Sequence, residues 1–223
     1  MGEYSNKIFT LSPEGSAAEL TLPQMRSACA SPAVVTHEGL IVVVHGEGAD
    51  SGVEALNTTF PNPEWKQVEP LPYFSATPSA TIVNGYLVVW IGTVYCMHLS
   101  CITADRRNTH RLPSNWMALP SPPKSISLQL TSYKDQLAAF TIAEDRQVLG
   151  YQFDQSHREW IKCCTLGTVS TALPYQPSIR VSTSAHSVAV MWDDMSHVNT
   201  SRYGSPDRFT ILRVCTMKEP LRE

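Results

Sequence analysis

The pattern of hydrophobic and polar positions recurs four times along the chain. Each copy has a strand whose positions alternate between apolar and polar, a short turn with Gly, Asn, Asp or His, and a second strand that is almost continuously apolar. Alternation predicts a strand with one buried face, and a continuous apolar run predicts a strand buried on both faces. The four hairpins start at Ser31, Thr77, Ser125 and Pro177.

Two more strands complete each copy. A third strand starts at Val53, Val94, Val148 and Arg208 in the four copies. A fourth strand follows in the first three copies and is marked by Trp65, Trp116 and Trp160. The second strands start 47, 50 and 51 residues apart, and four short strands at a period near 50 residues are typical of a β-propeller blade. An aromatic ring at a fixed place in the outer strand can wedge between blades, so we expect the tryptophans to be core residues.

The last copy lacks a fourth strand near the C-terminus. The N-terminal segment that starts at Ala18, AELTLP, parallels the outer strand that starts at Trp65, WKQVEPLP. We therefore expect the two chain ends to share one blade, which would remove an exposed sheet edge. The predicted fold is all-β, a four-bladed β-propeller that forms a single domain over residues 1–223. Five blades are the alternative, and they need a strand from Asn6 with two further partner strands.

These blades resemble those of two known groups of proteins. A tryptophan followed by Leu-Pro in the outer strand resembles kelch repeats. The compact hairpin of the form Pro-Ala…Gly-Leu-Val-Val resembles the blades of fucose-binding lectins. The resemblance covers nearly the whole chain and implies a propeller fold with a ligand site at the axial opening.

Charge and hydropathy exclude several classes of function. The net charge is −3, and the 17 basic and 20 acidic residues are scattered, so we expect neither a nucleic-acid nor a membrane partner. The longest apolar runs are far shorter than the roughly 20 residues of a membrane span. No basic segment followed by an apolar segment is visible at the N-terminus, so we expect a cytoplasmic protein, with secretion as the alternative.

The six cysteines are too sparse for a disulfide scaffold, so we expect buried thiols. Adjacent Cys163 and Cys164 lie on a predicted strand and should point to opposite faces, which would keep their sulfur atoms apart. No Cys/His cluster has the spacing of a zinc site, and we expect no metal and no cofactor.

The propeller resemblance implies a site built by two sets of loops, those before each first strand and those between second and third strands. The first set carries Arg26, Tyr73, Phe74, Lys124 and Tyr175 at matching places. Three aromatic and two cationic side chains around one opening would suit a small-molecule pocket. Alternatively, the tyrosines cap the edges of blades.

In the second set, the loop of the last copy is the longest. It carries Trp192, Asp193, His197, Arg202 and Tyr203. Long loops in compact domains are usually functional or disordered, so this segment is either a lid with acid–base and aromatic contacts or a solvated polar loop. In the first copy, His45 with Glu47 could form an acid–base pair, or the segment HGEGADSG could simply be a glycine-rich turn.

The candidate loops are not copies of one another, which favours one asymmetric site over four equal sugar sites. The chain has no glycine-rich phosphate loop and no Gly-x-Ser-x-Gly nucleophile motif. The leading hypothesis is therefore a cofactor-free cyclase or pericyclase that performs a Diels–Alder-type addition on a largely apolar small molecule. Such an enzyme would be similar to the propeller-type cyclases (hetero-Diels–Alderases) of fungal secondary metabolism.

In this hypothesis Arg26 or Lys124 polarises a carbonyl group of the substrate. Whether the protein is an enzyme stays open, because a carbohydrate-binding lectin and a kelch-like protein scaffold are the alternatives. The oligomeric state is open as well. The candidate catalytic residues are Arg26, Lys124, His197 and Arg202, and the candidate substrate-binding residues are Tyr73, Phe74, Tyr175, Trp192, His45, Asp193 and Tyr203.

Overall fold

The computed structural model describes a chain built almost entirely of antiparallel β-strands. The described residues are 9–11, 17–19, 22–47, 52–73, 75, 77–103, 115–169, 178–183, 188–194 and 209–215. The chain divides into two compact units, Met1–Ala118 and Leu119–Glu223. The expectation of a single domain over residues 1–223 stays a prediction.

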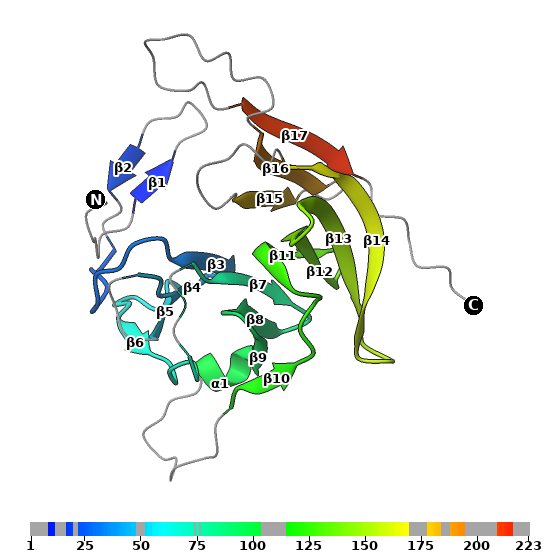
Figure 1. Cartoon of the computed structure of the whole chain (residues 1–223). Helices are drawn as coiled ribbons and strands as arrows, with labels where there is room; N and C mark the ends of the chain where they lie inside the picture. The colour runs from blue at the N-terminus through cyan, green and yellow to red at the C-terminus, as the bar shows by residue number, and fades with distance from the viewer. Residues whose placement is uncertain are drawn as a thin grey trace, which may run out of the picture. The chain divides into compact units, whose positions relative to one another are not determined.

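The first unit contains two four-stranded sheets, each with its strands in chain order (Figure 1). The first sheet is β3 (Ala33–His37), β4 (Leu40–Val44), β5 (Val53–Asn57) and β6 (Trp65–Gln67). The second is β7 (Ser79–Val83), β8 (Tyr86–Trp90), β9 (Val94–His98) and β10 (Met117–Leu119), with the short helix α1 (Leu99–Thr103) after β9. The first strands of these sheets, β3 and β7, lie beside each other.

The second unit repeats this arrangement. Its complete sheet is β11 (Ser125–Tyr133), β12 (Gln136–Ala143), β13 (Gln147–Asp154) and β14 (Glu159–Thr168). Its second sheet is β15 (Ile179–Thr183), β16 (Val188–Asp194) and β17 (Phe209–Cys215). The first strands β11 and β15 are again neighbours. The strands therefore agree with the four predicted copies, while α1 was not predicted.

Two-residue turns set the register of the first three hairpins. Both turn residues have positive φ in each hairpin, as in Asn84 (49°) with Gly85 (76°) and Lys134 (49°) with Asp135 (58°). Turns of this kind match the right-handed twist of the flanking strands, and Asn-Gly is their preferred sequence. In the second hairpin the turn pairs Val83 with Tyr86 and carries the register to Ser79 opposite Trp90.

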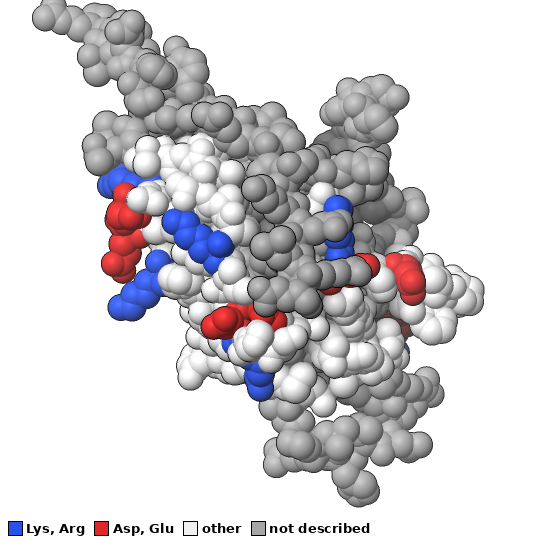
Figure 2. Space-filling view, turned by 90° about the vertical axis from the view of Figure 1, so that its right-hand side faces the viewer, with Lys and Arg blue, Asp and Glu red and all other residues white. Residues whose placement is uncertain are grey.

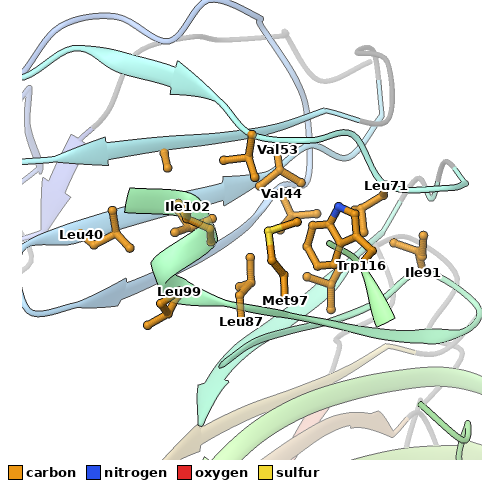
Figure 3. Close-up of a cluster of buried hydrophobic side chains, with 14 residues drawn as sticks. Leu40, Val44, Val53, Leu71, Leu87, Ile91, Met97, Leu99, Ile102 and Trp116 are labelled. Atoms are coloured by element: carbon orange, nitrogen blue, oxygen red, sulfur yellow. The ribbon is translucent and has the colours of Figure 1, made fainter. Parts of the chain in front are cut away.

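The second strand of the first three hairpins is largely buried, as its continuous apolar sequence predicts. Its side chains fill the core of each unit, because a central strand presents both faces to packed neighbours. In the first unit, side chains of α1 and of Trp116 join those of the two sheets around Met97 (Figure 3). A separate cluster in the second unit contains Phe140, Val190 and Trp192.

The three outer-strand tryptophans make the same hydrogen bond. The indole N–H of Trp65 donates to the carbonyl oxygen of Pro23 at 2.7 Å, that of Trp116 to Glu69 at 3.0 Å, and that of Trp160 to Pro120 at 2.7 Å. Glu69 and Pro120 each lie just after the outer strand of the preceding copy. Trp65 and Trp116 are buried, and Trp160 is half-buried against Phe153. Trp65 and Trp116 are therefore core residues, as the repeat predicts, whereas Trp160 is only partly buried.

Ring closure and the number of blades stay predictions. The N-terminal strand β2 (Ala17–Glu19) pairs with β1 (Phe9–Leu11), and among the described pairings β17 pairs only with β16. The strand from Asn6, considered only for a five-bladed fold, therefore exists in part as β1. The bond from Trp65 to Pro23 supports the alignment of the N-terminal segment with an outer strand.

Candidate functional site

Strand direction places candidate residues at one end of each sheet of the first unit. In an antiparallel sheet, the segment before the first strand and the loop between the second and third strands lie at the same end. At this end of the first sheet lie Arg26, before β3, and His45, directly after β4. Tyr73 lies at the corresponding end of the second sheet, before β7.

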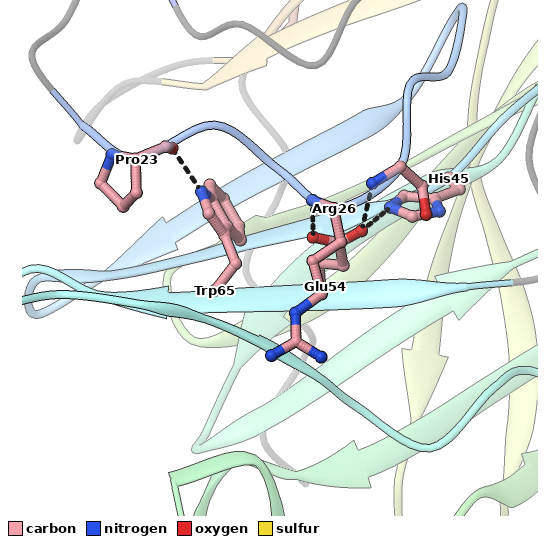
Figure 4. Close-up of polar contacts among 6 residues, drawn as sticks. Pro23, Arg26, His45, Glu54 and Trp65 are labelled. Carbon is pink, nitrogen blue, oxygen red and sulfur yellow. Dashed lines mark hydrogen bonds and ion pairs between the residues drawn. The ribbon is translucent and has the colours of Figure 1, made fainter.

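A buried carboxylate organises the end of the first sheet. Glu54, in β5, is 2% exposed and accepts hydrogen bonds from the backbone N–H groups of Arg26 at 2.9 Å and Ser27 at 3.0 Å (Figure 4). Nε2 of His45 lies 3.3 Å from Oε1 of Glu54, the oxygen that also accepts the hydrogen bond from Ser27. A buried charge needs such partners, because its desolvation is otherwise very unfavourable. Glu54 is not among the site residues that the sequence predicts; its signal is a single acidic residue between the apolar Val53 and Ala55.

His45 is held neutral by its surroundings. Its side chain is 4% exposed, and burial lowers the pKa of the imidazole, while the charge of Glu54 raises this pKa by a smaller effect. The contact with Glu54 is short, but its angles do not meet those of a hydrogen bond. Glu47, the expected carboxylate partner, contributes its backbone carbonyl to Ala30 instead. The acidic neighbour of His45 is therefore Glu54.

Cys29 completes this buried group but is not an activated nucleophile. Burial raises the pKa of its thiol, the charge of Glu54 raises it further, and a hydrogen bond from the backbone of Gly46 opposes both. A thiol with a raised pKa stays protonated at neutral pH and reacts slowly. The group of Cys29, His45 and Glu54 thus resembles a catalytic set in composition but acts as part of the core.

The contacts of Glu54 and its neighbours anchor residues 22–32, and this segment presents the cationic side chain of Arg26 to solvent. Residues 22–32 are held through Glu54, through the bond from Trp65 to Pro23, and through the bond between Ala30 and Glu47 at 2.8 Å. The side chain of Arg26 is exposed, and its guanidinium group extends away from His45 (Figure 4). A fixed backbone with an exposed guanidinium suits the recognition of a polar ligand.

The other described candidates differ in exposure. Tyr73 is 65% exposed and follows the buried Leu71. Lys124 is exposed directly before β11 in the second unit. Trp192 is 2% exposed in the core of that unit, and its indole nitrogen has no hydrogen-bond partner among the described residues. The backbone N–H of Arg26 and the imidazole of His45 both contact Glu54, whereas the guanidinium group of Arg26 extends away from His45.

The side chains of six candidate residues lie outside the described part of the chain. Asp193 is in β16 opposite Thr210, and its side chain lies outside the described residues. Phe74, Tyr175, His197, Arg202 and Tyr203 lie outside the described residues altogether. The proposed roles of all six side chains stay predictions.

The described part of the chain carries no group of three or more His, Cys, Asp and Glu side chains suited to a metal ion. On the face in Figure 2, its acidic and basic side chains are interspersed in small groups. Within the same residues, no helix has the length and apolar character needed to cross a membrane.

Comparison with known proteins identifies the fold. No family model matches the chain, and no curated protein matches its sequence. Among solved structures, that of YjhT aligns with a TM-score of 0.52 at 11% identity, over 89% of this chain and 68% of YjhT. The SapL1 lectin in complex with alpha methyl fucoside aligns with a TM-score of 0.55 at 12% identity, over 86% of this chain and 60% of the lectin. The chain thus spans less than two thirds of the lectin. The fold of the chain is all-β and propeller-like.

Proposed function

We propose that this protein is a carbohydrate-binding propeller module with one principal sugar site. Tyr73 carries the proposal, because this large aromatic residue is 65% exposed in the segment before β7. Aromatic faces pack well against the apolar faces of sugar rings, and a tyrosine hydroxyl can also bond to a sugar hydroxyl. The likeness in fold to a lectin that binds a methyl fucoside is consistent with this ligand class.

Arg26 supplies the polar half of the proposed recognition. Its backbone is fixed by Glu54, so its position costs less entropy on binding than that of a residue in an unanchored loop. The planar guanidinium group offers several N–H donors to sugar hydroxyl, ring or carboxylate oxygens. The proposed ligand is thus a neutral or acidic sugar.

The sequence differences between the loops predict one such site in place of a repeated one. The matching loop positions of the four copies read Arg26, Tyr73, Lys124 and Tyr175, so no single residue type recurs in every copy. A single shallow site lacks the avidity of repeated sites, so we expect a dissociation constant of about 1 mM, or about −4 kcal/mol.

The first prediction tests this function with two matched aromatic substitutions. Tyr73→Ala should weaken binding of the best glycan from an array at least tenfold, which corresponds to about 1.4 kcal/mol, because the stacking face is lost. Phe60→Ala is the control: Phe60 is 58% exposed, between β5 and β6, at the other end of its sheet. Titration of each variant by NMR measures the effect. Absence of any glycan binding, or an equal loss in both variants, would contradict the proposal.

The cyclase hypothesis is a second candidate, favoured by the exposure of both proposed polarising cations, Arg26 and Lys124. His45 is buried, so carbonyl activation falls to these two side chains among the described candidates. The second prediction is that the double variant Arg26→Ala/Lys124→Ala slows turnover of a reactive diene–carbonyl substrate by about 100-fold. Unchanged single-turnover rates would remove the polarising role, and sugar binding without any turnover would favour the lectin.

A further inference from the structure

Two adjacent cysteines occupy an irregular part of the sheet formed by β11, β12, β13 and β14. Cys163 and Cys164 are in β14, the last strand of its sheet in the described pairings. Adjacent residues of a regular strand point to opposite faces, which is the arrangement expected from the sequence.

A β-bulge overturns that expectation. Gly150 of β13 pairs with Cys164, but the next residue, Tyr151, pairs with Lys162. Cys163 is therefore an extra residue, and the two cysteines together oppose one residue of the neighbouring strand. Such a bulge re-aims side chains that a regular strand would separate.

The positions of the sulfur atoms agree with the bulge. A Cβ atom built on Gly150 would lie 2.5 Å from Sγ of Cys164 and 3.4 Å from Sγ of Cys163. Both sulfur atoms therefore lie over the same glycine, and they cannot be farther apart than the sum of these two distances. A side chain at Gly150 would collide with Cys164, so the glycine makes room for the pair.

The two thiols differ in access. Cys164 is half-buried and packs against the apolar cluster that contains Phe140. Cys163 is exposed. A reagent can thus reach Cys163 first, while the core holds Cys164 beside it.

We propose that Cys163 and Cys164 form a vicinal dithiol site that binds a thiophilic atom through both sulfurs, with a trivalent organoarsenical as the probe. Direct disulfide formation is less favourable here. Adjacent Cα atoms are about 3.8 Å apart, whereas ordinary disulfides join Cα atoms about 4.4–6.8 Å apart, so such a bond is strained and easily reduced. A bridging atom closes a ring that is one atom larger and relieves this strain.

The binding step needs no oxidant. A hydrated arsenical has two As–O bonds to hydroxyl groups. Each thiol forms one As–S bond, each hydroxyl leaves with a thiol proton as water, and the oxidation states of arsenic and sulfur do not change. Soft thiolate ligands suit such an acceptor. The second As–S bond forms within the molecule, so the effective concentration of Cys164 is high once Cys163 has reacted.

The third prediction is tested with phenylarsine oxide on the full chain. We expect one tightly held arsenical per chain by intact mass, which an excess dithiol such as 2,3-dimercaptopropanol removes and an excess monothiol does not. Cys163→Ser and Cys164→Ser should each weaken binding by about 100-fold, because only one As–S bond remains. Cys101→Ser, a half-buried cysteine of α1, is the control and should bind as the unaltered protein does.

Because Cys163 is exposed, Cys163→Ser tests the site without disturbing the core. Gly150→Ala gives an independent readout, since the added methyl group displaces Cys164 and should weaken the arsenical complex while leaving both thiols in place. Equal binding by the unaltered protein and Cys163→Ser, or displacement of the arsenical from the unaltered protein by a monothiol, would overturn the proposal.

Discussion

At the scale of single residues, the environment of a side chain decides its role more than its chemistry does. His45 and Cys29 carry groups that catalyse reactions in many enzymes, yet both are buried next to Glu54. The Glu54 carboxylate in turn bonds to two backbone N–H groups and holds residues 22–32 in place. What reaches solvent from this group is the side chain of Arg26.

The fourth prediction follows from the lowered pKa of His45. A lowered folded-state pKa means that the unfolded chain binds a proton more readily, so the free energy of unfolding falls as the pH drops below the ordinary value of 6.5. Urea unfolding should show this loss below about pH 6.5 in the unaltered protein and a flatter profile in His45→Gln.

His157 gives a control of opposite sign. It is exposed, and its Nδ1 lies 2.6 Å from Oδ2 of Asp154, whose hydrogen bond and charge raise the pKa of the imidazole. The stability that His157 contributes is fully present below its ordinary pKa and is lost as the pH rises through the raised pKa. His157→Gln should therefore change the dependence of the free energy of unfolding on pH mainly above pH 6.5. Identical pH profiles for the unaltered protein and His45→Gln would show that His45 does not govern acid sensitivity.

At the scale of elements, a hydrogen bond from each outer-strand tryptophan ties one copy of the repeat to the segment that ends the copy before it. The aromatic position is visible in the sequence, and so is its period. The acceptor is not visible, because it is a backbone carbonyl about 40 or more residues earlier in the chain, and any residue type could supply it.

The fifth prediction compares two of these tryptophans. Trp65→Phe keeps an apolar ring but leaves the carbonyl of Pro23 without its donor in a partly buried place, so it should lower the free energy of unfolding by about 1–3 kcal/mol. Trp160→Phe removes the same kind of bond at an exposed place, where water can replace the donor, and should cost about 1 kcal/mol or less. Denaturant titration measures both, and a larger loss for Trp160→Phe would contradict this account.

At the scale of the whole molecule, each unit contains two consecutive copies of the repeat whose first strands lie side by side. A four-stranded sheet cannot bury both of its faces alone, so neighbouring sheets must stack, and this gives the propeller-like arrangement shared with the solved structures. The sharing of a blade by the two chain ends is a contact between distant segments, and it stays a prediction together with the number of blades.

The sequence alone determined the strands of the four copies, their order and the turns of the first three hairpins, because period-two patterns and turn residues such as Asn84-Gly85 act over a few neighbouring positions. The tertiary structure decided which polar groups became buried and which way irregular residues point. Glu54 replaced Glu47 as the neighbour of His45, and a bulge brought Cys163 and Cys164 over Gly150. Both outcomes depend on backbone contacts with other strands and segments, and residue type encodes such contacts only weakly.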